Sequence, residues 1–322
     1  MLSISPCNLC PRACAAPRAV GVAGVCGADD RLLVARAALH FWEEPPLSGL
    51  PREDGTRAGS GAIFFVNCPL HCVFCQNAVI AEGGYGVSVS IDRLAQIMLE
   101  LQGQGALNIN CVTPTHYALH IMQAVRTARV NGLQIPVVWN TSGYETVEAV
   151  RALADTVDVY LDDFKYASSE VAARYSHASD YPQVALAALD AMVDTAGAPA
   201  FDEVDGQPRM TRGVVVRHLL LPGEMENSRA CVKLLHDRYG DNILLSIMNQ
   251  YTPVLASAAE AGDARAQAVL KKHPHLAQKV PDEDYERLLD YADSIGCDDY
   301  FWQVGPAAKE SFVPAWDGTG VV

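Results

Sequence analysis

The stretch Cys68-Pro69-Leu70-His71-Cys72-Val73-Phe74-Cys75-Gln76-Asn77 carries three cysteines at C-x3-C-x2-C spacing. Just before it, the apolar run Gly61–Val66 predicts a short buried strand. The cysteines therefore lie on a loop that leaves a strand end, where soft thiolates can converge on one ion or cluster. Three thiolates leave a cube of four irons one ligand short, so the fourth iron would be open to a small molecule. The competing interpretation is a set of core cysteines or part of a zinc site.

This segment resembles the cluster loop of the radical S-adenosylmethionine (SAM) superfamily, in which an aromatic residue, here Phe74, precedes the third cysteine. The resemblance implies that Cys68, Cys72 and Cys75 hold a [4Fe–4S] cluster. It implies that the fourth iron chelates the amino and carboxylate groups of SAM. It also implies that an electron cleaves SAM to methionine and a 5'-deoxyadenosyl radical, which removes a hydrogen atom from a substrate.

A second set of cysteines lies near the N-terminus, at Cys7, Cys10, Cys14 and Cys26. Four cysteines with a leading C-x2-C pair predict a closed metal site, either tetrahedral zinc or a four-thiolate iron–sulfur cluster. The sequence favours neither metal over the other. Because all four thiolates would be used, we expect a structural or electron-relaying site without an open coordination position. The competing interpretation is that these are free structural cysteines.

Composition limits the classes of protein to which the chain can belong. Half of its 322 residues are hydrophobic and 19% are charged, which is typical of a globular protein with a sizeable core. The net charge of −14 disfavours nucleic acid as a partner. No apolar run is long enough to span a bilayer and residues 1–6 lack a secretory pattern, so we expect a cytoplasmic protein without membrane contact. Ten cysteines in such a chain indicate metal binding rather than disulfides.

Strand-like and helix-like segments alternate from residue 61 to residue 255, which predicts a parallel α/β sheet or barrel. One connecting helix is predicted to begin after Ser90, and Asp205-Gly206 predicts a hairpin turn. Five helices are predicted between six strands. The predicted strands are Gly61–Val66, Leu107–Val112, Ile135–Trp139, Val157–Leu161, Val214–Leu221 and Ile243–Met248.

The expected fold is α/β, a partial (β/α)6 barrel of the TIM type, as is characteristic of radical SAM enzymes. Residues 1–57 are expected to form an N-terminal cysteine-rich extension and loop, residues 58–255 the barrel, and residues 256–322 a C-terminal extension packed on it. That tail is predicted to contain a helix near Asp282–Ile295 and an added strand at Phe301–Val304.

Two prolines forbid a regular helix in the loop of residues 40–57, which we expect to pack over the mouth of the barrel. Its charged residues His40, Glu43 and Glu44 are expected to be solvated rather than part of an active site.

Polar residues at strand ends are the candidate site residues, because parallel α/β folds bind ligands there. Arg217 and His218 alternate along one strand, so only one of them faces the interior. His116 and His120 lie one helical turn apart, and without a third ligand we favour a surface or cap role for them. The residues assigned to the site on this ground are Thr113, Thr115, Asn140, Ser142, Asp163, Lys165, Arg217 and Gln250.

The chain also resembles pyruvate formate-lyase-activating enzymes and related radical SAM proteins. The triplet Asp163-Phe164-Lys165 is similar to the Asp-Leu-Lys of those activases, which implies that its polar groups contact SAM. Phe74, Cys75 and Gln76 match the positions where the activases' cluster loop contacts the adenine.

The chain departs from the activases at two places. Thr113-Pro114-Thr115 stands where activases carry Gly-Gly-Glu to receive the SAM amino group, so that contact must be made differently. Residues 78–110 contain no cysteine, although many activases carry a ferredoxin-like insert there. A glycyl-radical substrate is therefore implied by kinship only.

These observations favour a radical SAM enzyme that acts on a protein or peptide, with glycyl-radical-enzyme activation as one form of that activity. A flavodoxin- or ferredoxin-type protein is the electron donor that the resemblance implies. Two alternatives stay open: radical chemistry on a small molecule or RNA, and a non-catalytic iron–sulfur electron carrier.

Overall fold

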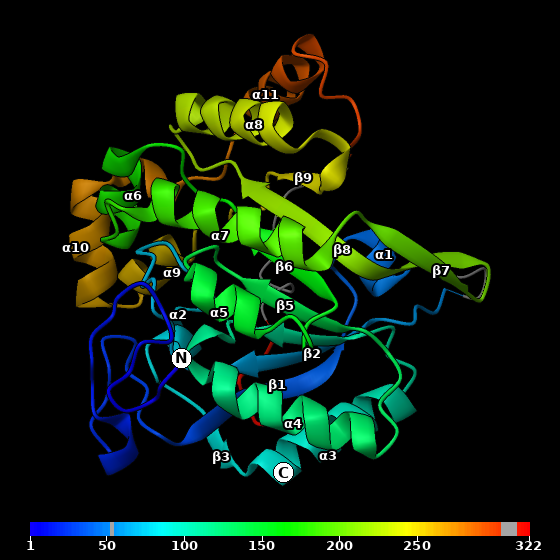
Figure 1. Ribbon diagram of the computed structural model, residues 1–322. Helices are drawn as coiled ribbons and strands as arrows, with labels where there is room; N and C mark the ends of the chain where they lie inside the picture. Colours follow the sequence, from blue (N-terminus) through cyan, green and yellow to red (C-terminus); the bar gives the residue numbers. More distant parts are fainter. Residues whose placement is uncertain (52–54, 304–313) are drawn as a thin grey trace.

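A curved, mostly parallel sheet forms the centre of the fold (Figure 1). The computed structural model describes residues 1–51, 55–303 and 314–322. Within them the strand order is β10-β9-β8-β6-β5-β4-β2-β1-β3, and β7 pairs with β8. The strands are β1 (Leu32–His40), β2 (Ser60–Phe65), β3 (Val87–Val89), β4 (Ile109–Val112), β5 (Val137–Thr141), β6 (Val159–Asp163), β7 (Ala200–Val204), β8 (Gln207–Leu219), β9 (Leu244–Met248) and β10 (Tyr300–Trp302).

The strands β2, β4, β5, β6, β8, β9 and β10 pair in parallel, as expected for a partial barrel. Six of them, β2, β4, β5, β6, β8 and β9, are the strands that the sequence predicted, and β10 is the added strand of the tail. The fold prediction is thereby confirmed, and the sheet does not close on itself within the described residues. Val304, the predicted end of the added strand, lies outside those residues.

The antiparallel additions to the sheet are β1, β3 and β7. β1 pairs with both β2 and β3, which joins the N-terminal extension to the barrel. β7 and β8 form a hairpin that projects from the body (Figure 1). Its turn is Asp205-Gly206, where both residues have positive φ (51° and 76°), as the sequence predicted.

Helices cover the outer face of the sheet (Figure 1). Ser90 accepts a hydrogen bond from the backbone N–H of Arg93, so α3 begins with the predicted cap. The helices are α1 (Pro45–Ser48), α2 (Ala78–Ala81), α3 (Ile91–Gly103), α4 (Ala118–Val130), α5 (Val147–Ala152), α6 (Ser169–Ser176), α7 (Tyr181–Ala196), α8 (Met225–Tyr239), α9 (Val254–Glu260), α10 (Ala264–Lys272) and α11 (Asp282–Ser294).

The inner face of the barrel is filled by α1 and the residues before it. Leu47 is fully buried against Val138, Leu161 and Val215, and the Nδ2 of Asn108 donates to its carbonyl oxygen (2.8 Å). The expectation that this loop packs over the barrel mouth is wrong for residues 43–49, which lie inside the barrel. An unclosed barrel leaves an apolar inner surface, and burying Leu47 there removes that surface from water.

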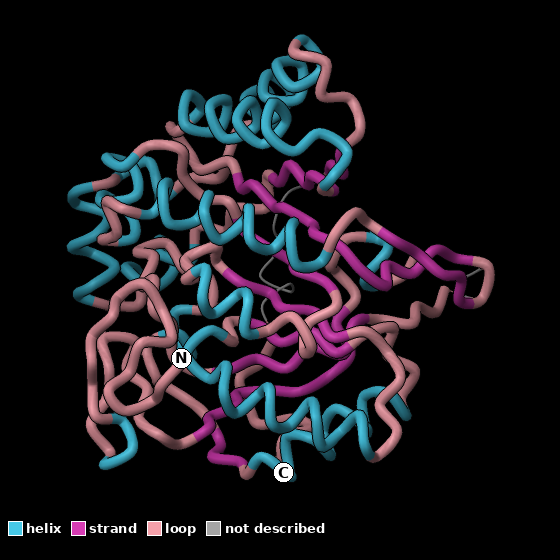
Figure 2. Tube along the Cα trace, viewed as in Figure 1, coloured by secondary structure: helices cyan, strands magenta, loops and turns pink. Residues whose placement is uncertain are grey.

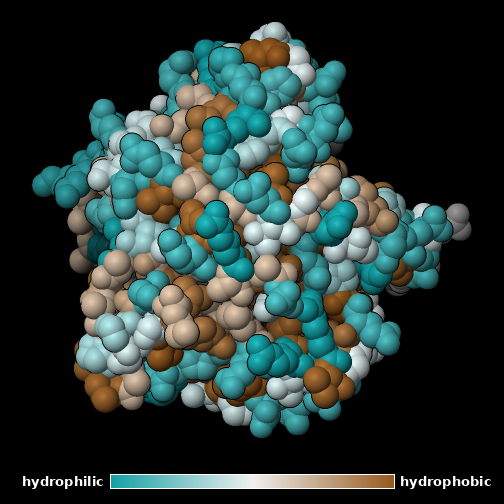
Figure 3. Space-filling model, viewed as in Figure 1, coloured by the Kyte–Doolittle hydropathy of each residue, from teal (hydrophilic) through white to brown (hydrophobic). Residues whose placement is uncertain are grey.

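On the face shown in Figure 3, hydrophilic (teal) side chains alternate with smaller apolar (brown and tan) patches. In the described part of the chain, no helix is long and apolar enough to cross a membrane. Residues 1–31 run mostly as loops beside the sheet (Figure 2), with one short 3₁₀ helix at Arg18–Val20.

Candidate active site

The loop after β2 brings its three cysteines to one cavity at the carboxyl ends of the strands. Cys68, Cys72 and Cys75 are all free thiols and all line this cavity, whose volume is about 230 Å³. His71, from the same loop, turns away, and its Nε2 lies 3.0 Å from the carbonyl oxygen of Val25. The loop therefore presents sulfur as its metal-binding donor type to the cavity, which fits an iron–sulfur cluster.

Neighbouring segments fix the shape of this loop. The N–H of Val73 donates to the carbonyl oxygen of Tyr175 (2.8 Å), and the hydroxyl of Ser176 donates to the Sγ of Cys72 (3.1 Å). Phe74 packs edge-on against the rings of Tyr175 and Tyr251, at centroid distances of 6.2 and 6.3 Å. The end of α6 thus supports the loop from behind.

Burial governs the ionisation of two of these thiols, Cys68 and Cys75. It raises the pKa of Cys68 to about 11 and that of Cys75 to about 12, and the neighbouring Cys72 adds to both shifts. Without a bound cation the thiols of Cys68 and Cys75 stay protonated at neutral pH. Metal binding here must therefore release protons.

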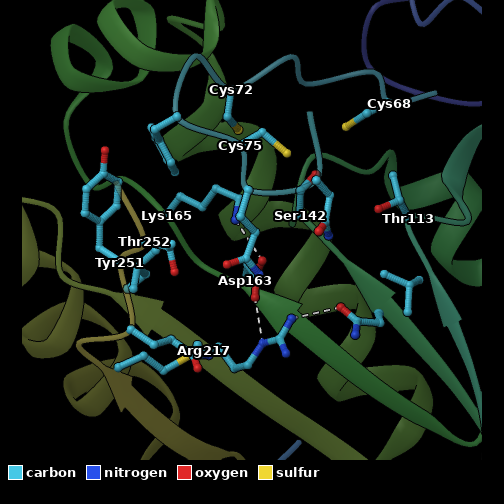
Figure 4. A pocket seen from close by; sticks show the side chains of 18 of the residues that line it. Cys68, Cys72, Cys75, Thr113, Ser142, Asp163, Lys165, Arg217, Tyr251 and Thr252 are labelled. Atoms are coloured by element: carbon cyan, nitrogen blue, oxygen red, sulfur yellow. Dashed lines mark hydrogen bonds and ion pairs between the residues drawn. The ribbon is translucent and has the colours of Figure 1, made fainter. Parts of the chain in front are cut away.

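A charged network faces the cysteines across the cavity (Figure 4). Asp163 accepts from the Nε of Arg217 and from the Nζ of Lys165, each at 2.7 Å. Arg217 also donates to the Oδ1 of Asn140 and the Oε2 of Glu43, both at 2.9 Å. One guanidinium therefore connects β5, β6 and β8 with the segment inside the barrel.

The charges of this network hold one another in the ionised state. Burial favours the neutral form of Asp163, but the charges of Arg217 and Lys165 outweigh it and lower the pKa of this carboxyl. Burial likewise opposes the charge on Lys165, yet Asp163 raises its pKa. All three groups are thus charged at neutral pH and present a mixed-sign surface to the cavity.

Alternation along the strands decides which predicted residues face the cavity. Arg217 lines it, whereas His218 points outward with its Nδ1 2.8 Å from the carbonyl oxygen of Phe164. Asp163 lines it, whereas Asp162 is buried on the other face, where its carboxylate oxygens have no hydrogen-bond partner among the described residues. Burial, followed by the charge of Asp163, raises the pKa of Asp162 well above its ordinary value.

Most of the other predicted site residues also line the cavity. Thr115 is the exception, and its assignment needs correction: it is buried in a 3₁₀ turn, and its hydroxyl donates to the Oε1 of Glu145 (2.6 Å). The predicted residues that line the cavity are Phe74, Gln76, Thr113, Asn140, Ser142, Asp163, Lys165, Arg217 and Gln250.

Two expectations about charged residues are wrong. Glu43 is not solvated: it pairs with Arg217 and accepts from the Nδ2 of Asn110 (2.9 Å). Glu44 is buried too, and burial raises its pKa. The sequence did hold a signal for a second carboxylate. Arg217 and Lys165 were both expected near one carboxylate, Asp163, and two buried cations require more than one anionic partner.

His116 and His120 do not form a metal pair. His116 is buried rather than at the surface, with its Nε2 2.7 Å from the carbonyl oxygen of Val66. Burial lowers its pKa to about 3, so it stays neutral. His120 lies 3.8 Å from a carboxylate oxygen of Asp30.

The N-terminal cysteines gather in the loops beside α4 and α5. Cys7, Cys10 and Cys26 are buried, Cys14 is partly exposed, and all four are free. A Cβ at Gly24 would lie 3.2 Å from the Sγ of Cys14 and 3.6 Å from that of Cys26, so the absence of a side chain there lets both sulfurs lie close to the backbone. In the described part of the chain, no three His, Cys, Asp or Glu side chains are close enough to hold a metal ion. Metal binding at either cysteine set is therefore a proposal based on donor chemistry and placement.

An unclosed parallel α/β barrel with three free cysteines on the loop after its first strand defines a cofactor-dependent barrel protein. Residues 62–234, more than half of the chain, match the family model described as the Radical SAM superfamily. The chain belongs to this superfamily. Membership implies an enzyme with a [4Fe–4S] cluster and SAM as cofactors.

Two further comparisons give individual relatives. Over 260 residues the chain is 26% identical to the uncharacterized protein MJ0674 of Methanocaldococcus jannaschii, a match that covers 76% of this chain. The chain spans about 65% of the length of that curated relative. Streptococcus suis SuiB, solved with its precursor peptide SuiA, aligns at 13% identity with a TM-score of 0.47, covering 74% of this chain and 46% of SuiB.

We predict that Asp163→Asn destabilises the protein by roughly 2–3 kcal/mol, because it leaves Arg217 and Lys165 without their shared counter-ion. The loss is below that of a fully buried pair, since the Asp163 side chain is 25% exposed. The pKa of Asp163 is lowered by folding, so its contribution is present above the unfolded-state pKa of about 3.9 and is lost as the pH falls through the folded value. The difference in free energy of unfolding between the wild type and Asp163→Asn should therefore shrink below about pH 4.

Urea unfolding of both proteins from pH 3 to pH 7 measures this difference. Asp237→Asn is the matched control, because it removes an exposed carboxylate that pairs with Lys233, and it should cost less than about 0.5 kcal/mol. An equal loss in the two variants, or a loss for Asp163→Asn that does not change with pH, would contradict the charge assignment.

Proposed function

We propose that Cys68, Cys72 and Cys75 bind the [4Fe–4S] cluster and that the adjoining cavity binds SAM, for hydrogen abstraction from a protein or peptide. The observation that carries this proposal is the shared cavity: three free thiols on one wall and the Asp163, Lys165 and Arg217 network on the other. When bound together, the two cofactors supply a 5'-deoxyadenosyl radical, a strong hydrogen-abstracting group.

The polar side chains of the cavity suit the two ends of SAM. Its methionine end carries an ammonium and a carboxylate, which match the mixed-sign surface of Asp163 and Lys165. Thr113, Ser142 and Gln250 line the cavity without side-chain hydrogen-bond partners among the described residues, so they are available to a ligand. Phe74 and Gln76, on the cluster loop, are the residues we assign to the adenine end.

An exposed aromatic side chain supports a polypeptide substrate. Trp42 lines the cavity, yet 51% of its surface is exposed, and the guanidinium of Arg57 lies 5.3 Å from its ring centroid. Large aromatic rings that stay partly exposed at the edge of a cavity are typical contact points for protein partners. We propose that Trp42 contacts the peptide that delivers its hydrogen atom to the cavity.

Two narrower points are part of the same proposal. A flavodoxin- or ferredoxin-type protein would supply the electron, and activation of a glycyl-radical enzyme would be one form of the reaction; both rest on kinship. A second metal, zinc or iron–sulfur, is proposed at Cys7, Cys10, Cys14 and Cys26, because four free thiols lie in one loop segment.

We predict that reconstituted protein with dithionite and SAM forms 5'-deoxyadenosine, and that Cys72→Ala abolishes this product by removing one of three cluster ligands. Chromatographic assay of 5'-deoxyadenosine measures the outcome. Cys297→Ala, which alters a buried thiol outside the cavity, should keep the wild-type yield. Circular dichroism checks that both variants are folded. Product formation by Cys72→Ala would sink the cluster assignment.

We predict that the triple variant Cys68→Ala/Cys72→Ala/Cys75→Ala still binds about one zinc ion, or iron with sulfide, because four thiolates bind soft metals tightly. Elemental analysis of the purified protein measures this. Adding Cys10→Ser to the same variant should remove the metal. A metal-free triple variant in which residues 7–26 stay fully protected from proteolysis would refute the second site.

We predict that a polypeptide partner, rather than a metabolite or RNA, accelerates SAM cleavage. Trp42→Ala should raise the KM for that polypeptide about tenfold, which corresponds to the loss of one aromatic contact, while slow cleavage without substrate stays unchanged. Steady-state assays with candidate polypeptides, metabolites and RNA give the comparison. Acceleration by a metabolite or RNA alone would overturn the substrate class and leave the cluster assignment intact.

A further inference from the structure

One side chain of the N-terminal cysteine segment reaches the cluster loop. The Nε of Arg12 donates to the carbonyl oxygen of Pro69 (2.9 Å), and one terminal nitrogen lies 3.4 Å from that of Leu70. The guanidinium also donates to the carbonyl oxygens of Ser176 (3.1 Å) and His177 (2.8 Å) at the end of α6. Arg12 lies between Cys10 and Cys14 in sequence, so it couples three segments that are far apart along the chain.

The loop depends on such donors. Pro69 and Leu70 are buried and lie between the first two cysteines of the loop, outside any helix or strand. Buried carbonyl groups without a partner are costly, and a planar guanidinium can serve several of them at once. The ring of Tyr144 stands 5.2 Å from the Arg12 guanidinium and keeps it in place. Arg12 therefore helps to determine where Cys68 and Cys72 lie.

A second contact runs between the same two segments. The Nε2 of His71, in the cluster loop, lies 3.0 Å from the carbonyl oxygen of Val25, which directly precedes Cys26. The two contacts thus join the cluster loop to both ends of the N-terminal cysteine set, near Cys10 and near Cys26.

The N-terminal segment has little apolar core of its own. Its buried apolar cluster consists of Cys7, Leu9 and Ala16. Such a small cluster does not stabilise a loop by itself, whereas a tetrahedral metal site does. The sulfurs of Cys14 and Cys26 both lie close to the backbone of Gly24, where a Cβ would crowd them, so two of the four thiols approach the same point.

We infer that metal binding by Cys7, Cys10, Cys14 and Cys26 holds Arg12 against the cluster loop, and thereby sets the position of the three cluster ligands. Arg12 is a positioning residue that links a structural metal site to the catalytic loop. The inference rests on the proposed assignment of Cys68, Cys72 and Cys75 to the cluster. It assigns the N-terminal metal no part in electron transfer.

Hydrogen exchange of the cluster loop tests this link without cluster, SAM or turnover. The parent protein is Cys68→Ala/Cys72→Ala/Cys75→Ala, in which zinc can bind only at the N-terminal set. Mass spectrometry follows amide exchange in residues 66–78, with zinc bound and after removal of zinc by a chelator. Removing zinc should accelerate exchange there by roughly tenfold, since the loop loses hydrogen bonds to a charged group.

Substitution of Arg12 separates the link from a general loss of stability. When Arg12→Met is added to the parent, residues 66–78 should exchange as fast with zinc bound as the parent does without zinc. Removal of zinc from this variant should then increase the exchange rate only slightly. The control is Arg31→Met: Arg31 is 67% exposed and pairs with Asp29, and its loss should leave the loop at the parent rate. If Arg12→Met does not fold, Arg12→Lys replaces it, because lysine keeps the positive charge but lacks the planar guanidinium that serves several carbonyl groups. In that case the exchange rate of residues 66–78 in the parent, with and without zinc, decides whether the link exists.

The inference is overturned if the parent binds no zinc, if the loop exchanges equally with and without zinc, or if Arg12→Met and Arg31→Met behave alike. These outcomes are distinct from failure of the proposed function. If the wild type forms no 5'-deoxyadenosine, the exchange result still stands, and if exchange is insensitive to Arg12, SAM cleavage by the wild type is unaffected.

Discussion

The ion pair between Arg217 and Asp163 is the interaction on which the cavity depends. Arg217 and Lys165 place two positive charges inside the barrel, and Asp163 and Glu43 place two negative charges beside them. Buried charges are stable only when they are balanced and hydrogen-bonded. The α-ammonium and α-carboxylate groups of SAM carry one charge of each sign, so these two groups would leave that balance unchanged.

The same network explains why the segment before α1 lies inside the barrel. Val138, Leu161 and Val215 stand two residues before Asn140, Asp163 and Arg217, so they form an apolar layer on the same inner face of the strands. Leu47 covers that layer, and Glu43, four residues earlier, reaches Arg217. One short segment therefore satisfies the apolar and the polar layers together.

Sequence patterns predicted the parts of the structure that local chemistry determines. Apolar runs marked β2, β4, β5, β6, β8 and β9, Asp205-Gly206 marked the hairpin, and period-two alternation indicated that only one of Arg217 and His218 faces the interior. The roles of Glu43, Thr115 and His116 depend on partners distant in sequence, which are Arg217, Glu145 and the backbone of Val66. The two cations indicated that a further carboxylate was needed, but local patterns do not identify which one. β1 and β3 were missed for the same reason, since their pairing is antiparallel and lies outside the alternating unit.

The walls of the cavity come from two kinds of segment. The cysteines, Asp163, Lys165 and Arg217 all lie within residues 62–234, the part that matches the superfamily. The cavity is also lined by His40, Trp42 and Glu43, which precede that part, and by Gln250, Tyr251 and Pro314, which follow it. Chemistry shared across a family has to reside in the shared part, and recognition of a particular substrate needs groups that can differ. It follows that a difference in substrate preference between this chain and other members of the superfamily would arise in the cavity lining outside residues 62–234, and above all at Trp42, because Glu43 also serves Arg217 in the charged network.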